Sequence, residues 1–134
     1  MEKQVVAKGP YAELIPDGVR VGEVIYLSGA ISVDDQGAPV HEGDFLAQNR
    51  QAYANIEKAL KEFGADLSNV AKETVFVTDV SLPMGDPERP WQDYAAMHAD
   101  VFGGGPNEVA QSMIEVAGLV LPELLVEIEV VAHV

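Results

Sequence analysis

Hydrophobic residues return at helical spacing in the middle of the chain. Between Asp44 and Gly64 the apolar residues Leu46, Tyr53, Ile56, Leu60 and Phe63 recur at intervals of three, four or seven residues, which correspond to one or two helical turns. Asp44 is suited to cap the first turn, and Gly64 is suited to end the last one. The pattern predicts a helix over residues 44–64.

A second helix is predicted after the proline-rich segment 81–90, which is not expected to hold regular structure for long. Pro90 suits the first turn of a helix because its missing N–H is not needed there. One side of this helix carries Trp91, Tyr94, Ala95, His98 and Phe102. The run Gly103-Gly104-Gly105-Pro106 should end it.

The remaining hydrophobic stretches have the short, β-branched character of strands. Residues 3–7 and 19–33 are interrupted by turn-forming Gly and Pro, and residues 24–28 are apolar enough for a central strand. Residues 74–78 predict another buried strand, because they are β-branched and aromatic.

The last third of the chain predicts two strands with alternating faces. In the first strand Gln111, Met113 and Glu115 alternate with Ser112, Ile114 and Val116. In the second strand Leu124, Val126, Ile128 and Val130 alternate with Leu125, Glu127, Glu129 and Val131. We expect Met113, Leu125 and Val131 to share the face that does not meet the core. A half-apolar sheet surface of this kind favours contact between subunits.

These elements predict one α+β domain over residues 1–134, since no repeat, linker or change of composition divides the chain. Helices must bury their apolar sides on a sheet. The expected architecture is therefore a two-layer domain, with a mixed sheet and both helices on one face.

The amino-acid composition limits the kinds of partner and site that the protein is expected to have. The net charge of -14 opposes binding to nucleic acid, whose phosphates need positive charge. The absence of cysteine excludes disulfides and thiolate sites. No apolar run is long enough for a membrane span, and no secretory signal is visible, so we expect a cytoplasmic protein without membrane contact.

Few residues suggest chemistry by their spacing. His41, His98 and His133 are isolated from one another, so neither a metal site nor another cofactor is expected. His98 is interpreted as a hydrogen-bonded core or rim residue. The glycines 103–105 lack the lysine and the strand-to-helix setting of a phosphate loop.

Glu127 is the most informative ionisable residue, because it interrupts the apolar strand 124–131. A carboxylate there must be solvated, paired or used in function. Two interpretations stay open: an outward polar position of a half-buried strand, or a functional carboxylate in a cleft with a raised pKa.

Five sequence motifs are spread in order over nearly the whole chain: Gly9-Pro10-Tyr11, residues 24–29, residues 48–56, residues 75–79 and residues 126–132. Together they resemble the Rid (YjgF/YER057c/UK114) family. The resemblance implies a chorismate-mutase-like fold and a homotrimer with ligand clefts between neighbouring subunits.

The resemblance also implies an activity, the hydrolysis of reactive imines and enamines derived from amino acids to a keto acid and ammonia. Glu127 matches the glutamate that holds or activates water, and Tyr11 matches a tyrosine of the cleft. Ser28 and Gly29 match the segment whose backbone groups line the cleft. We also count Met113 and Trp91 as substrate-binding, Trp91 because it follows the long loop 81–90.

Gln111 departs from the family pattern, which has an arginine for the substrate carboxylate at this position. A glutamine amide offers only neutral donors and one acceptor. The substrate need not carry a carboxylate. The alternative to an imine hydrolase is a trimer that binds a small metabolite or has a regulatory role without catalysis. An endoribonuclease is less favoured, because RNA binding is opposed by the net charge.

Overall fold

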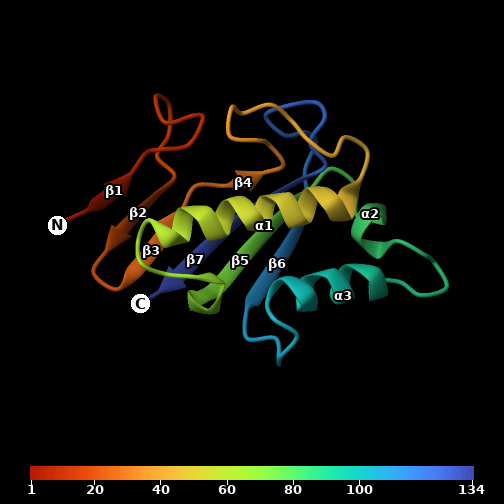
Figure 1. Ribbon diagram of the computed structural model, residues 1–134. Helices are drawn as coiled ribbons and strands as arrows, with labels where there is room; N and C mark the ends of the chain where they lie inside the picture. The colour runs from red at the N-terminus through yellow and green to blue at the C-terminus, as the bar shows by residue number, and fades with distance from the viewer.

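A mixed sheet of seven strands forms one layer of the computed structural model, which describes residues 1–134 (Figure 1). The strands are β1 (Gln4–Val6), β2 (Gly18–Val21), β3 (Val24–Leu27), β4 (Ala30–Ile31), β5 (Val70–Val77), β6 (Ala110–Glu115) and β7 (Val126–His133). Their order in the sheet is β1-β2-β3-β7-β5-β6, and β4 also pairs with β7. Only β5 and β6 run parallel.

Helices cover one face of this sheet. They are α1 (Phe45–Lys61), α2 (Ser81–Met84) and α3 (Gln92–Val101), with a 3₁₀ turn at Leu67–Asn69. Figure 1 shows α1 and α3 on the same side of the strands. The expected α+β class, with two layers and the main helices on one face, is confirmed.

The predicted first helix is confirmed, although α1 ends at Lys61, three residues before Gly64. Asp44 caps α1 by accepting a hydrogen bond from the Ala47 N–H at 3.1 Å. Gly64 takes φ of 73°, a left-handed conformation that side chains disfavour, and the chain turns away from the helix there.

The region around the second helix differs from the prediction in two details. The segment 81–90 begins with the single helical turn of α2 before it becomes irregular. The helix α3 starts at Gln92, so Pro90 lies outside it. The reason is Trp91, which precedes the helix with a left-handed φ of 70°.

The core lies between the two layers. Tyr53, Ile56 and Leu60 of α1 pack in one hydrophobic cluster with Val75 of β5 and Ile128 of β7. Because Ile128 is fully buried, its truncation to alanine should cost about 2–5 kcal/mol of stability.

The expected position of Met113 on the open face of the sheet is wrong. Met113 is paired with the fully buried Val75 in the parallel ladder, and it packs against the core under the helices. Leu125 precedes β7 and also packs against that core. The alternation of residues assigned Gln111, Met113 and Glu115 correctly to one face of β6. The prediction chose the wrong face as the outer one, because Gln111 and Glu115 are polar although they lie on the side that faces the helices.

The open face is nevertheless half apolar. Tyr26 of β3 is 50% exposed and Ile114 of β6 is 44% exposed. Val131 of β7 is opposite Tyr26, and Glu127 and Glu129 lie along the same strand. None of the helices has the length and apolar composition needed to cross a membrane.

Candidate functional site

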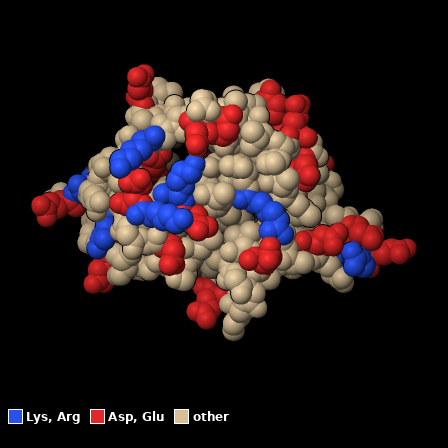
Figure 2. Space-filling model, viewed as in Figure 1, with Lys and Arg blue, Asp and Glu red and all other residues tan.

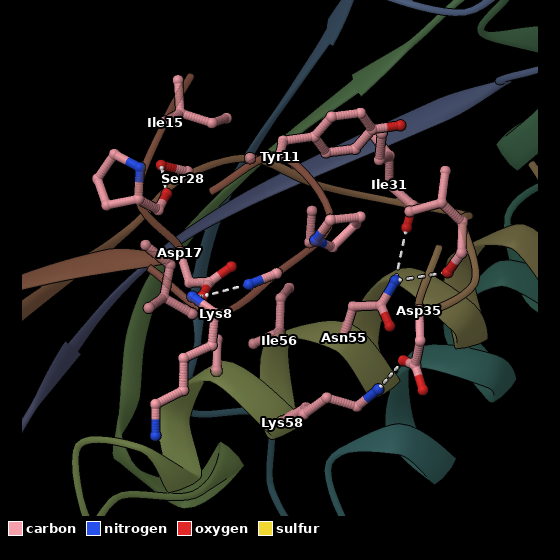
Figure 3. Close-up of a pocket in the computed structure, with 18 of the residues that line it drawn as sticks. Lys8, Tyr11, Ile15, Asp17, Ser28, Ile31, Asp35, Asn55, Ile56 and Lys58 are labelled. Atoms are coloured by element: carbon pink, nitrogen blue, oxygen red, sulfur yellow. Dashed lines mark hydrogen bonds and ion pairs between the residues drawn. The ribbon is translucent and has the colours of Figure 1, made fainter. Parts of the chain in front are cut away.

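A pocket of about 710 Å³ lies between the loop that follows β1, the segment joining β3 to Asp35, and the C-terminal half of α1 (Figure 3). Four of the predicted site residues line it: Tyr11, Ser28, Gly29 and Glu127. They come from three separate stretches of sequence. The structure therefore brings together in one chain the residues proposed for catalysis and two of those proposed for binding.

Glu127 reaches the pocket because the strand pairing of β7 is interrupted beside it. β3 pairs with β7 up to Tyr26, and β4 resumes the pairing at Ala30, so Ser28 and Gly29 lie between the two ladders. A side chain on Gly29 would place its Cβ 2.5 Å from Glu127 Oε2. Only glycine at position 29 leaves the carboxylate its present place against the backbone.

The electrostatic environment of Glu127 favours its neutral form. Its side chain is half-buried, and burial raises its pKa above the ordinary value, with a further contribution from the negative charge of Glu129. No cation or hydrogen-bond donor of the chain offsets these two effects. A carboxyl group with a raised pKa is better matched to proton transfer near neutral pH.

Tyr11 forms a fixed wall of the pocket. Its hydroxyl donates to the Gly37 carbonyl at 3.0 Å, and its ring lies against Gly37, which has φ of 82°. Because the hydroxyl hydrogen is committed to Gly37, Tyr11 can offer a ligand its ring and a lone pair, not a proton.

Ser28 and Gly29 differ in what they leave for a ligand. The Ser28 hydroxyl donates to the Pro16 carbonyl at 2.7 Å, and the Ser28 N–H donates to the Asp17 carbonyl at 3.0 Å. Ser28 thus anchors the loop over the pocket. The N–H of Gly29 has no partner in the chain, so the backbone donor available beside Glu127 is that of Gly29.

Both lysines at the pocket are already paired. Lys8 Nζ lies 2.8 Å from Glu62, and Lys58 Nζ lies 2.5 Å from Asp35 (Figure 3). Asp17, the remaining acidic residue near Lys8, accepts the N–H groups of Lys8 and Gly9. The pocket lining therefore holds no unpaired cation of this chain to anchor a carboxylate.

The other three predicted binding residues lie outside this pocket in the single chain. Met113 belongs to the core, and Gln111 lies on β6 at the edge of the sheet. Trp91 precedes α3 and is 41% exposed. In Figure 1 the segment between α2 and α3 lies beside the N-terminal end of α1, whereas the pocket lies along its C-terminal half.

A buried polar cluster between the sheet and the helices was missed at the sequence level. Its centre is Glu73 of β5, which is fully buried and is held by Tyr53, His98 and Gln111. His98 is thus a hydrogen-bonded core residue, as predicted. Glu73 interrupts an apolar strand just as Glu127 does, and the same argument about the cost of a carboxylate would have found it.

The structure offers no group of three or more histidine, aspartate or glutamate side chains placed to hold a metal ion. The arrangement around Glu127 consists instead of one partly buried carboxylate, one free backbone donor, an aromatic wall and an apolar floor. Together the fold and the pocket define a small α+β protein that can hold an uncharged or cationic organic molecule beside a carboxylate.

Comparisons with known proteins agree with this class. The family model described as Endoribonuclease L-PSP matches residues 1–134. A RutC family protein of Sulfurisphaera tokodaii is 32% identical over 130 residues, which cover 97% of this chain and 92% of that protein. The chain belongs to the Rid (YjgF/YER057c/UK114) family.

Solved structures show the same fold. Rv2704 of Mycobacterium tuberculosis, described as a member of the YjgF/YER057c/UK114 family, is 31% identical with a TM-score of 0.76, and the match covers 99% of this chain and 100% of that one. The Rid family protein YyfA of Yersinia pestis is 29% identical with a TM-score of 0.82, over 99% and 100% of the two chains.

Proposed function

We propose that the protein hydrolyses a reactive imine or enamine in the pocket around Glu127, on a substrate that need not carry a carboxylate. The observation that carries this proposal is the half-buried Glu127, which has no counter-charge and lies against Gly29. A protonated imine is a cation, and the ionised Glu127 attracts it.

The reaction needs only water and this carboxylate. Glu127 accepts a proton from water as the water oxygen bonds to the carbon of the protonated C=N group. The nitrogen of the resulting carbinolamine then receives this proton back from Glu127. As the C–N bond breaks and the carbonyl forms, the hydroxyl group gives its proton to Glu127, which passes it to the departing ammonia, so that a carbonyl compound and an ammonium ion leave. General-base assistance of this kind contributes about 10²–10⁴ in rate. The N–H of Gly29, which has no partner in the chain, is the donor that we assign to the oxygen of the intermediate.

We propose further that three copies assemble through the open sheet face and that position 111 of one subunit reaches the pocket of its neighbour. Two features support this arrangement. The open face exposes Tyr26 and Ile114, and the pocket mouth exposes Leu14 and Val120. Apolar groups grouped in this way are usually covered by a partner.

The test is ammonia release from freshly generated 2-aminoacrylate and from an uncharged imine. Glu127→Gln should lower turnover by about 10²–10⁴ while the fold and the assembly persist. Glu108→Gln, an exposed carboxylate in the loop before β6, is the matched control and should leave turnover unchanged. Equal turnover in Glu127→Gln and the wild type would refute the proposed role of Glu127.

A second candidate function is ligand binding without catalysis. The observation that favours it is the Tyr11 hydroxyl, which donates its hydrogen to the Gly37 carbonyl and so leaves Glu127 as the one proposed catalytic residue with a proton to transfer. Saturable binding of an imine or its carbonyl analogue, with no turnover in the wild type, would support this candidate.

The distribution of charged side chains argues against ribonuclease activity, which the family description names. Lys8, Arg50, Lys58, Lys61 and Arg89 are all engaged with acidic side chains. Figure 2 shows the basic residues of the viewed face beside acidic ones rather than gathered in a patch. Salt-dependent retention of RNA would contradict this exclusion.

A further inference from the structure

The buried Glu73 is surrounded by groups that donate to it. The Tyr53 hydroxyl donates to Glu73 Oε1 at 2.6 Å, His98 Nε2 lies 2.5 Å from Oε2, and Gln111 Nε2 lies 3.1 Å from the same oxygen. Tyr53 and Tyr94 remain hydroxyls, since burial and the negative charge of Glu73 raise the pKa of Tyr94 to about 12 and that of Tyr53 still further.

This cluster fixes the orientation of the Gln111 side chain. A carboxylate only accepts hydrogen bonds, so the end of the amide that faces Glu73 must be its nitrogen. The same nitrogen also donates to the Tyr94 hydroxyl at 3.0 Å. Both hydrogens of the amide are therefore used inside the domain.

The carbonyl oxygen of Gln111 is left for the outside. It makes no hydrogen bond within the chain, and Gln111 is an exposed residue of the edge strand β6. What this position presents to a ligand is thus an acceptor backed by a buried negative charge. The arginine of the family pattern would present a positive donor at the same position.

We propose that Glu73 and Tyr94 position Gln111 as a hydrogen-bond acceptor, and that the ligand group held there is an N–H donor such as an amide, an amine or a protonated imine. This inference rests on the proposed function, because it takes position 111 as part of the ligand cleft between subunits. Glu73 is a positioning residue, since it acts on the ligand through Gln111.

An arginine introduced at position 111 of this chain would not bind a ligand carboxylate as the arginine of the family pattern does. A guanidinium there would be drawn to the buried carboxylate of Glu73, which already lies 3.1 Å from the present Nε2. It would form an internal ion pair and would not reach a ligand. Gln111→Arg alone should therefore fail to create a carboxylate site, whereas Gln111→Arg with Glu73→Gln should create one.

The experiment compares two probes with the same carbon skeleton, 2-oxobutanamide and 2-oxobutanoate, whose binding is measured by calorimetry or by NMR titration. The wild type should bind the amide at least about tenfold more tightly than the acid, a difference typical of one well-placed polar contact. Gln111→Leu should remove that preference. The double variant should reverse it, while Gln111→Arg should not gain affinity for the acid.

Three results would overturn the inference. They are equal or tighter binding of the acid by the wild type, an equal gain of acid binding in Gln111→Arg and the double variant, and no binding of either probe by the wild type. Thermal denaturation checks that each variant is folded. If Glu73→Gln fails that check, Tyr94→Phe removes one of the two contacts of the Gln111 nitrogen, and it should reduce the preference for the amide without abolishing it.

Turnover and the preference between the two probes, measured on the same variants, test the proposed function and this inference separately. Glu127→Gln should lose turnover and keep the preference for the amide. A preference without turnover in the wild type would leave the inference standing and refute the hydrolase, and turnover without a preference would do the reverse.

Discussion

At the scale of single residues, the site depends on how closely Glu127 lies to the chain that passes over it. Its carboxylate is half-buried, lies against Gly29, and is near a second carboxylate, Glu129, on the same strand. Such a placement lowers stability and suits proton transfer, and a strand residue held in this way is expected at a functional position.

The raised pKa of Glu127 gives a prediction for stability. The folded protein holds a proton on Glu127 more tightly than the unfolded chain does, so this group favours folding most below its ordinary pKa of 4.5. Its contribution is lost as the pH rises through the raised pKa of the folded state. Glu127→Gln should therefore have a higher melting temperature than the wild type near neutral pH, and the difference should vanish at low pH.

Thermal denaturation from about pH 4 to about pH 8 measures this effect across the carboxyl range. Glu108→Gln again serves as the control, and its difference from the wild type should not change with pH. A lower melting temperature of Glu127→Gln at neutral pH would show instead that the carboxylate stabilises the fold.

Gly29 gives a second prediction. The methyl group of Gly29→Ala would meet Glu127 Oε2 at 2.5 Å, and the flexible end of the glutamate should move away while the backbone stays. A displacement of about 1 Å can cost about 10² in rate, so turnover should fall by that order with little change in melting temperature. Gly105→Ala, which meets nothing within 4 Å, is the control and should keep full activity.

At the scale of elements, α1 is specified mainly by its own sequence. Asp44→Ala removes the hydrogen bond to the Ala47 N–H and should lower the free energy of unfolding by about 1 kcal/mol, as measured by chemical denaturation. Asp44→Asn keeps an acceptor at the cap and should lose little. Equal losses in the two variants would show that charge, and not the hydrogen bond, stabilises this end of α1.

Features of the fold that depend on residues adjacent in the chain could be predicted from the sequence. Asp44 and Gly64 act on the backbone next to them, so the ends of α1 were predictable. Met113 and Gln111 were not, because their setting depends on which face of β6 meets the helices, and only the pairing of β6 with β5 decides that.

Some residues of the candidate site could be found from the sequence and others could not. Tyr11, Ser28 and Gly29 were found through the family resemblance, and Glu127 was first found as a carboxylate inside an apolar strand. Neither argument requires knowledge of the contacts. Glu73 was missed because its partners come from α1, α3 and β6, elements far from it in sequence. The start of α3 was also missed, since the left-handed Trp91 has no signature in the sequence.

At the scale of the whole molecule, the open sheet face decides whether the protein works as a single chain. If this face joins subunits, Ile114→Glu should bury a charge in the interface and should dissociate the trimer at micromolar concentration. Light scattering after size-exclusion chromatography measures the mass. Ala54→Glu on the outer side of α1 is the matched control and should leave the mass unchanged.

The two rim ion pairs of the pocket also bear on how this protein could diverge. Lys58 already reaches the pocket with a positive charge, and a single exposed side chain, Asp35, neutralises it. Replacement of Asp35 by asparagine would release a cation at the entrance in one mutational step, without disturbing the core. The preference that we propose for uncharged or cationic substrates would thus be separated from a preference for anionic ones by very few substitutions, and new specificities could evolve here while the fold stays the same.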